Sequence, residues 1–288
     1  MNDFGGVPPL EFSYRVPWRA GAPRPGHHRG AHHGSGMDFI GHAPLPASPD
    51  PRRIDFRASL YDPFGQWQVR VYRQRASIAA CLVADLSASM GFAGAHRKLD
   101  VLADFTAALG HSAVRSGDAF AFVGCGRRVM TELVLPPTHA RGAAMDVAAA
   151  LRGLQPTADS ATGLRDAADY LPRQRSLVFL ASDFHFPIAL LDEILDGLGH
   201  HAVVPVVLWD AAESAPDADF GLARVRDAES GRARSVLLRP ALRQRWQAAF
   251  EQRRRMLEHC FSRRDLRPFF LVGEFQPDAM TAHFFGRN

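Results

Sequence analysis

Two hydrophobic patterns alternate along the chain. Short apolar runs, typical of strands that are buried on both faces of a sheet, occupy 77–84 and 176–181. Apolar residues three or four positions apart, as on one face of a helix, follow at 99–113 and at 188–198. Strands and helices that alternate in this way form crossover units on a parallel sheet. We therefore predict an α/β domain with a mostly parallel central sheet, in which 77–84 is the first core strand.

Other segments extend this prediction. Strands are expected at 66–72, 119–123, 129–135, 202–208 and 269–272, helices at 140–152, 163–171 and 240–262, and a hairpin at 222–238. Pro205 lies inside one of the predicted strands. Because proline cannot donate a hydrogen bond to a sheet, this position indicates a sheet edge or a bulge.

The first fifty residues differ in composition from the rest. Prolines and glycines make up about a third of this segment, which disfavours long helices and central strands. We expect an irregular arm that is extended or lies over the surface. Its histidines, His27, His28, His32 and His33, suggest either metal binding or a solvated loop, since no cysteine or carboxylate completes a ligand set. The predicted organisation is an arm at 1–50, a lead-in segment with one strand at 51–75, the α/β domain at 76–272 and a tail at 273–288.

The overall composition narrows the functional classes. The chain has 288 residues, of which 47% are hydrophobic and 22% charged, as in ordinary globular proteins. No apolar run reaches 18 residues, and the N-terminus does not resemble a secretory signal, so we expect no membrane span and a cytoplasmic location. Three cysteines without a C-x-x-C pair fit a reducing compartment. The net charge is +4, but the basic residues are interspersed with 30 acidic ones, which disfavours nucleic acid as a ligand.

Oxygen-bearing side chains follow the two apolar strands. Asp85, Ser87 and Ser89 come directly after 77–84, Asp183 comes after 176–181, and Thr162 opens a predicted helix between them. The carboxyl ends of parallel strands meet at one edge of a sheet, where such folds bind their ligands. Carboxylate and hydroxyl oxygens suit Mg²⁺, with Mn²⁺ or Ca²⁺ as alternatives. We therefore predict a divalent metal site, although the serines as helix caps and the aspartates as polar residues of a crevice are the structural alternative.

These residues resemble the metal-ion-dependent adhesion site of von Willebrand factor A-type domains, which have a Rossmann-like fold. More narrowly, the chain resembles the bacterial family known as domain of unknown function 58. The motifs that carry this resemblance are Arg52 to Arg57, with Phe56 in place of tryptophan, Asp85 to Met90, Lys98-Leu99, Gly117-Asp118 and Phe284-Phe285. The short form of the chain is similar to members that are encoded with methanol dehydrogenase maturation genes.

The resemblance implies a mode of action. Ser87 and Ser89 would bind the metal directly, Thr162 directly or through water, and Asp85 and Asp183 mostly through water. Met90 and His185 would form the rim on which a protein partner binds. An acidic side chain of that partner would complete the metal shell. Family members are commonly encoded beside MoxR-type AAA+ ATPases, so the implied role is that of a non-catalytic adaptor in the assembly or maturation of a complex.

Two other functions compete with this one. A metal-dependent hydrolase or phosphotransferase would use the same crevice with His185 as a base, but Ser87 stands where a haloacid dehalogenase has its second carboxylate. The chain also lacks the glycine-rich phosphate loop and the Gly-x-Ser-x-Gly elbow. Nucleic-acid binding would use the arginines of 240–267, although an amphipathic helix with a solvated basic face explains the same pattern.

Overall fold

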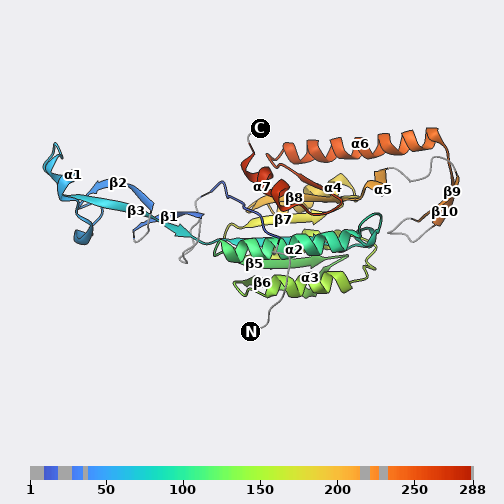
Figure 1. Ribbon diagram of the computed structural model, residues 1–288, viewed down its shortest axis with the longest axis horizontal. Coiled ribbons are helices and arrows are strands. Elements are labelled where there is room, and N and C mark those ends of the chain that lie inside the picture. Colours follow the sequence, from blue (N-terminus) through green and yellow to red (C-terminus); the bar gives the residue numbers. More distant parts are fainter. Residues whose placement is uncertain (1–9, 19–27, 35–37, 215–220, 227–232, 287–288) are drawn as a thin grey trace. The chain divides into compact units, whose positions relative to one another are not determined.

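The computed structural model describes residues 10–18, 28–34, 38–214, 221–226 and 233–286 (Figure 1). The chain forms two compact units, which are treated separately below. The larger unit comprises Met1–Tyr14, Ala79–Arg115 and Ala119–Asn288, and the smaller one comprises Arg15–Ile78 and Ser116–Asp118.

The larger unit is built on a six-stranded sheet with the order β11-β8-β7-β4-β5-β6. Its strands are β4 (Ala79–Asp85), β5 (Ala119–Cys125), β6 (Val129–Thr138), β7 (Leu177–Ser182), β8 (Ala202–Trp209) and β11 (Phe269–Val272). All neighbouring strands are parallel except β5 and β6, which are antiparallel. The prediction of a mostly parallel α/β sheet with its first core strand in the middle is therefore confirmed.

Helical layers cover both faces of this sheet (Figure 1). The helices are α2 (Lys98–Arg115), α3 (Ala143–Gly153), η3 (Thr162–Tyr170), α4 (Ile188–Gly197), α5 (Ala211–Ser214), α6 (Pro240–Ser262) and α7 (Pro277–Phe285), with a short 3₁₀ turn, η2 (Ala88–Gly91). Alternate residues of β4 point to opposite faces, and Cys81 and Val83 pack in one core cluster with Leu191 of α4 and Phe261 of α6. Helix α2 contacts β4, β5 and β8. Burial on both faces explains why the core strands are continuous apolar runs.

Two predicted elements differ in detail. The helix predicted at 163–171 is a 3₁₀ helix, Thr162–Tyr170, rather than an α-helix. At its start the Gly163 N–H donates to the Gly126 carbonyl, and a Cβ atom at Gly163 would lie 2.4 Å from the Arg128 carbonyl carbon. Pro205 lies inside the sheet, in the interior strand β8. However, β11 pairs only with 206–209, so Pro205 has no partner strand on the β11 side of β8. A residue without a backbone N–H fits such a position.

The hairpin and the last helices agree with the sequence. Strands β9 (Gly221–Arg226) and β10 (Ala233–Leu238) pair antiparallel, and the predicted turn between them lies outside the described residues. Helix α6 has the predicted bounds, since Pro240 at its first turn sets φ for a helix start. No described helix combines the length and the apolar character that crossing a bilayer demands.

Part of the predicted arm belongs to the core of the larger unit. The side chain of Phe12 is 2% exposed, and its ring stacks on Phe105 with centroids 5.8 Å apart. The backbone N–H of Phe12 donates to Ser112 Oγ at 2.9 Å. This segment therefore packs on α2 instead of lying over the surface. Burial of the aromatic side chain contributes more free energy than the ordering of the short extended backbone costs.

The smaller unit contains a three-stranded antiparallel sheet with the order β1-β3-β2. Its elements are β1 (His28–Gly34), β2 (Asp38–Pro44), η1 (Pro51–Arg53), α1 (Phe56–Leu60) and β3 (Gln68–Ala76). The prediction of an irregular arm is wrong for β1 and β2, which pair along the two edges of the correctly predicted lead-in strand β3. Gly41 lies at a register shift and Pro44 at the end of β2, where a sheet tolerates glycine and proline. The side chains of the histidine cluster lie outside the described residues.

Apolar side chains are exposed at one end of the smaller unit. Each is more than half exposed: Phe56, Leu60, Tyr61, Phe64 and Trp67. A cavity of about 200 Å³ is lined by Phe56, Leu60 and Trp67 together with polar and glycine residues of the same turn. These side chains add little to the stability of this unit, because little of their surface is removed from water.

Candidate functional site

The carboxylate of Asp85 is the centre of the polar edge of the large sheet. Asp85 ends β4 and is fully buried. Its Oδ2 accepts a hydrogen bond from Ser182 Oγ at 2.6 Å, and its Oδ1 accepts one from the Ser87 backbone N–H at 2.9 Å. Ser182 is the last residue of β7, which pairs with β4 in parallel register. The strand ends therefore meet as the parallel topology predicts.

The two serines after β4 lie side by side. Ser87 Oγ and Ser89 Oγ are 3.2 Å apart, and Ser87 is buried. Ser87 occupies the N-cap position of the 3₁₀ turn η2, but its side chain forms no capping hydrogen bond, so capping does not account for its hydroxyl. The next residue, Ala88, donates its N–H to the Ala158 carbonyl at 2.7 Å, which joins this turn to the loop before η3.

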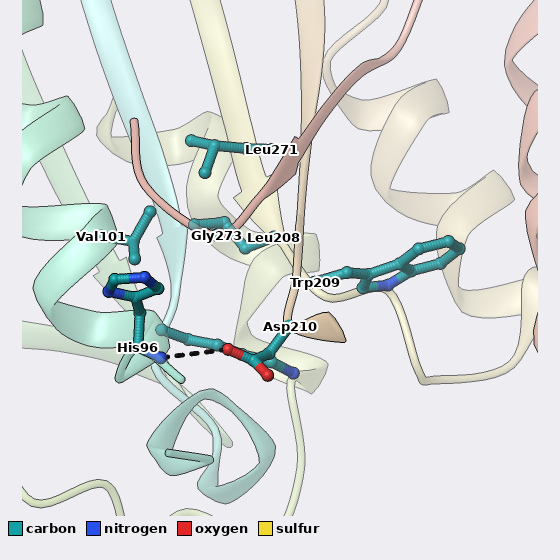
Figure 2. A pocket seen from close by; sticks show the side chains of 8 residues that line it. His96, Val101, Leu208, Trp209, Asp210, Leu271 and Gly273 are labelled. Carbon is teal, nitrogen blue, oxygen red and sulfur yellow. Dashed lines mark hydrogen bonds between the residues drawn. The ribbon is translucent and has the colours of Figure 1, made fainter. Parts of the chain in front are cut away.

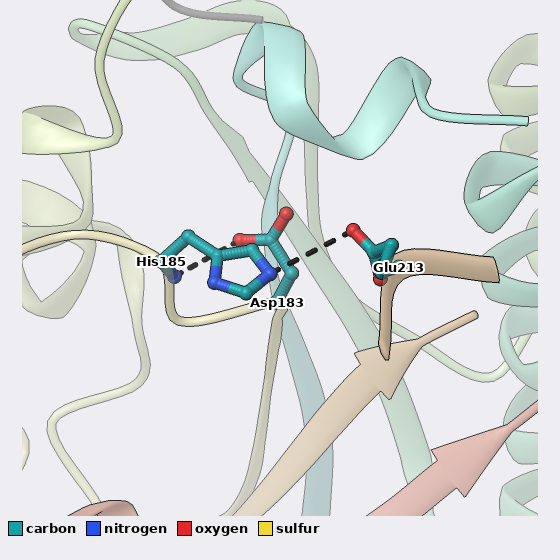
Figure 3. A group of neighbouring side chains, drawn as sticks. All are labelled: Asp183, His185 and Glu213. Atoms are coloured by element: carbon teal, nitrogen blue, oxygen red, sulfur yellow. Dashed lines mark hydrogen bonds and ion pairs between the residues drawn. The ribbon is translucent and has the colours of Figure 1, made fainter. Parts of the chain in front are cut away.

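Asp183 lies in a buried ion-pair network. Its Oδ2 is 2.9 Å from Lys98 Nζ, which is also 2.5 Å from Glu213 Oε1. The His185 backbone N–H donates to Asp183 Oδ1 at 3.2 Å, and His185 Nε2 lies 3.6 Å from Glu213 Oε1 (Figure 3). Asp183, His185 and Glu213 thus offer ligand atoms within 4.8 Å of one another. This network accounts for two residues, Lys98 and Glu213, to which the sequence assigned no role in the site.

The two aspartates of the site have opposite pKa shifts. Burial and the nearby charge of Asp183 raise the pKa of Asp85 to about 6. Burial also raises the pKa of Asp183, but the charges of Lys98 and His185 and a hydrogen bond from Ser89 outweigh it, so the pKa of Asp183 is lowered. Asp183 is therefore an ionised, compensated carboxylate, whereas Asp85 gains and loses a proton near neutral pH.

Lys98 is held as a permanent cation. Burial lowers its pKa, but the two anions Asp183 and Glu213 outweigh this effect and raise the pKa of Lys98 above its ordinary value. For Glu213, burial raises the pKa. Hydrogen bonds from His185 and Lys98 and the charge of Lys98 outweigh burial, so the pKa of Glu213 is lowered. The signal available in the sequence was that Lys98 is the single lysine among 34 basic residues.

A tight turn positions Lys98 at the start of α2. Asp210 Oδ2 accepts the His96 N–H at 3.2 Å, and a Cβ atom at Gly94 would lie 2.1 Å from Asp210 Oδ1. Glu213 Oε2 in turn accepts the Asp210 N–H at 2.9 Å. A water-sized cavity of about 10 Å³ lies beside this turn, lined by His96, Lys98 and Asp210 among others (Figure 2). The end of β8 thereby fixes the turn that carries Lys98.

Three further predicted site residues take different positions. Thr162 Oγ1 donates to the Arg127 carbonyl at 3.0 Å, so its hydroxyl is engaged by the neighbouring turn. Met90 is a residue of η2, and its side chain is fully buried. Its prediction as part of the partner-binding rim is therefore wrong. The side chain of His185 is one-third exposed and stacks on Trp209 with ring centroids 6.2 Å apart, so His185 does lie where the site meets solvent.

The donor set at this edge fits a hard divalent cation. Asp85, Ser87 and Ser89 supply carboxylate and hydroxyl oxygens from one turn, and Ser89 also contacts Asp183 through a hydrogen bond. Oxygen-only sets of this kind suit Mg²⁺ or Ca²⁺. The residues that would hold the ion are Asp85, Ser87 and Ser89, with Asp183 behind them. Thr162 Oγ1 donates its proton to the Arg127 carbonyl and keeps its lone pairs for an ion.

Two arginines of α6 have structural partners. The Arg253 guanidinium donates to the Phe184 and Phe186 carbonyl oxygens, and Arg254 pairs with Glu258 at 3.0 Å. The Arg253 hydrogen bonds attach α6 to the loop after β7, while the Arg254–Glu258 pair lies within the helix. They leave nucleic-acid binding without a specific structural observation in its favour.

The mostly parallel sheet between helical layers (Figure 1), with hydroxyl and carboxylate side chains at its carboxyl edge, defines an α/β domain whose architecture is consistent with the Rossmann-like, von Willebrand factor A-like fold predicted from the sequence. The chain belongs to the family described as "Protein of unknown function DUF58", whose sequence profile matches residues 50–256. This assignment confirms the resemblance seen in the sequence motifs.

Comparison with individual proteins gives one related sequence and distant structures. The chain is 35% identical over 98 residues to an "Uncharacterized protein in moxR 3'region" from Paracoccus denitrificans, which covers 34% of this chain and 93% of that protein. An aerotolerance-related membrane protein from Bacteroides fragilis aligns over 72% of this chain and 96% of its own, with 14% identity and a TM-score of 0.40. BatB from Bacteroides thetaiotaomicron aligns over 73% and 96%, with 11% identity and a TM-score of 0.38.

Proposed function

We propose that this protein is a metal-dependent protein-binding module that serves as an adaptor in the assembly or maturation of a protein complex. The observation that supports this function is the oxygen cluster of Asp85, Ser87 and Ser89 at the carboxyl edge of the sheet, next to Asp183. The cluster offers few negative charges, so a bound divalent ion keeps the ability to attract another anion. We assign no catalytic residue to the chain.

The chemistry of recognition follows from this donor set. Mg²⁺, with Mn²⁺ or Ca²⁺ as alternatives, supplies the Lewis acidity when it is bound. The two serine hydroxyls would hold the ion directly, and Asp85, which also orients the turn through the Ser87 N–H, would hold it mostly through water. An aspartate or glutamate of the partner occupies the remaining coordination position. His185, one-third exposed, contacts the partner beside the ion.

The proposed partner is a MoxR-type AAA+ ATPase. The Paracoccus denitrificans relative is named for its place beside moxR, and its matched region spans almost its whole length. We place the activity in the cytoplasm, where the three buried free cysteines stay reduced.

Calorimetric titration with Mg²⁺ and capture of the purified neighbouring ATPase test this function. Asp85→Ala is expected to lose Mg²⁺ binding and ATPase capture, and chelator is expected to abolish capture by the wild type. Asp104→Ala, which removes an exposed carboxylate paired with Arg152 on the surface, is the matched control and retains both. Capture that is indifferent to chelator and to Asp85→Ala contradicts the proposal.

A further inference from the structure

Lys98 is a buried cation paired with Asp183, the carboxylate behind the proposed metal site. Its ammonium group lies 2.9 Å from Asp183 Oδ2 and 2.5 Å from Glu213 Oε1, and its side chain is 2% exposed. A buried ammonium group is retained only where anions and hydrogen bonds compensate the loss of water. Here the two carboxylates supply that compensation from separate elements, the end of β7 and α5.

The position of this cation is built into the fold. Asp210 holds the turn before α2 through the His96 N–H, and it leaves no room for a side chain at Gly94. Glu213 bonds both to Lys98 and to the Asp210 backbone, so one side chain links the cation to the turn that carries it. The Lys98 ammonium also lies 5.7 Å from the centroid of the Phe92 ring.

Three side chains near Lys98 are arranged as they would be in a second metal site. Asp183, His185 and Glu213 place oxygen and nitrogen ligand atoms within 4.8 Å of one another. Without Lys98, two buried carboxylates would face each other uncompensated, a situation that draws in a divalent ion. The lysine already supplies the positive charge at that position.

We propose that Lys98 is the internal cation of this site and sets the strength with which the site holds a divalent ion. This inference rests on the proposed function and specifies how the site is tuned. Lys98 compensates Asp183 and Glu213, so Asp85 is left as the uncompensated carboxylate beside the two serines. The ion is then held loosely and remains short of negative charge, which favours addition of a partner's acidic side chain.

Mg²⁺ titration calorimetry on the full chain at pH 7.5 tests the proposal. Lys98→Met removes one positive charge and is expected to tighten Mg²⁺ binding by at least about tenfold, since Asp183, which contacts both Lys98 and Ser89, is then left uncompensated beside the ion. Glu213→Gln removes one negative charge and is expected to weaken binding by a similar factor. The double variant restores the net charge and is expected to bind within about threefold of the wild type.

Arg152→Met is the matched control, because it removes a positive charge that is paired with Asp104 at the surface. It leaves Mg²⁺ affinity unchanged. In chelator, Lys98→Met melts below the wild type, and Mg²⁺ raises its melting temperature more than that of the wild type. A purely structural lysine predicts the opposite, namely weaker Mg²⁺ binding by Lys98→Met.

The outcomes distinguish failure of this inference from failure of the proposed function. Wild-type Mg²⁺ binding with unchanged or weaker binding in folded Lys98→Met overturns the inference alone. No binding by the wild type, but binding by Lys98→Met, supports Lys98 as the internal cation and overturns the metal-dependent function. No binding by either protein overturns both. If Lys98→Met does not fold, Glu213→Gln decides, and unchanged or tighter binding by that variant overturns the inference.

Discussion

Ser182 donates a 2.6 Å hydrogen bond to Asp85, and this bond joins the ends of two neighbouring parallel strands. Ala84 and Ala181 are register partners, so the next residue of each strand lies at the same edge of the sheet. The bond engages one oxygen of the carboxylate, while the other accepts the Ser87 N–H. The orientation of Asp85 is thus determined by the sheet itself and by the turn that carries the serines.

Ser182→Ala is expected to weaken Mg²⁺ binding at pH 7 by about tenfold, because a hydrogen bond to a charged group is lost. The hydrogen bond from Ser182 lowers the pKa of Asp85, so its removal also favours the protonated carboxyl. Titration calorimetry measures the effect. Ser176→Ala, at another buried serine just before β7, is the matched control and binds Mg²⁺ as the wild type does. Equal affinities of Ser182→Ala and wild type would contradict the role of this bond.

Mg²⁺ affinity is expected to increase with pH and to level off above about pH 7. The pKa of Asp85 is raised to about 6 by burial and by the charge of Asp183, and the ion competes with the proton for this site. Below that pKa, affinity falls toward tenfold per pH unit. Calorimetric titrations at pH 5, 6, 7 and 8 measure the dependence.

Without metal, the raised pKa of Asp85 makes the folding stability fall as the pH rises, whereas Mg²⁺ affinity increases with pH. The folded-state pKa of Asp85 lies above its ordinary value of 3.8, so the folded state binds the extra proton. The stability that this proton contributes is present below about pH 4 and is lost as the pH rises through about 6. In chelator, the melting temperature of the wild type relative to Asp85→Asn therefore falls across this interval. A constant difference between the two proteins would show that Asp85 is already ionised.

Phe12→Ala is expected to lower the free energy of unfolding of the larger unit by about 3–5 kcal/mol, the cost of removing a large buried aromatic side chain. Phe12 is 2% exposed and packs against Phe105 and Phe179. Phe64→Ala is the matched control, because Phe64 is 82% exposed, and it changes stability by no more than about 0.5 kcal/mol. Urea unfolding measures both. Similar effects of the two variants would show that the N-terminal segment does not dock as described.

The core of the large unit was predictable because strands that are buried on both faces consist of continuous runs of apolar residues. Strands β4 and β7 are covered on both faces, so their residues are apolar without alternation, and the periodic residues of α2 and α4 mark a helix after each of these strands. Helix α6 was predicted with its bounds because Pro240 starts it. The 3₁₀ geometry of η3 was not, since apolar residues three apart fit both helix types.

The gathering of polar residues at this edge also followed from the sequence, because residues that end parallel strands share one edge of the sheet. Asp85, Ser87 and Asp183 were placed at this edge on that rule alone, and the structure puts Asp85 and Ser87 in contact. The rule does not give the direction of each side chain. Met90 was expected at the rim, but the turn η2 directs it into the core.

The sequence by itself determined the order of strands and helices, the family and the edge at which polar residues gather, because these depend on local periodicity and on short motifs. Only the tertiary structure decided that Lys98 neutralises Asp183, 85 residues away, and that Glu213 shares the same ammonium group. It likewise decided that Phe12 enters the core and that β1 and β2 pair with β3. Such contacts join segments that local patterns leave independent, and they are selected by burial and charge compensation in the folded chain.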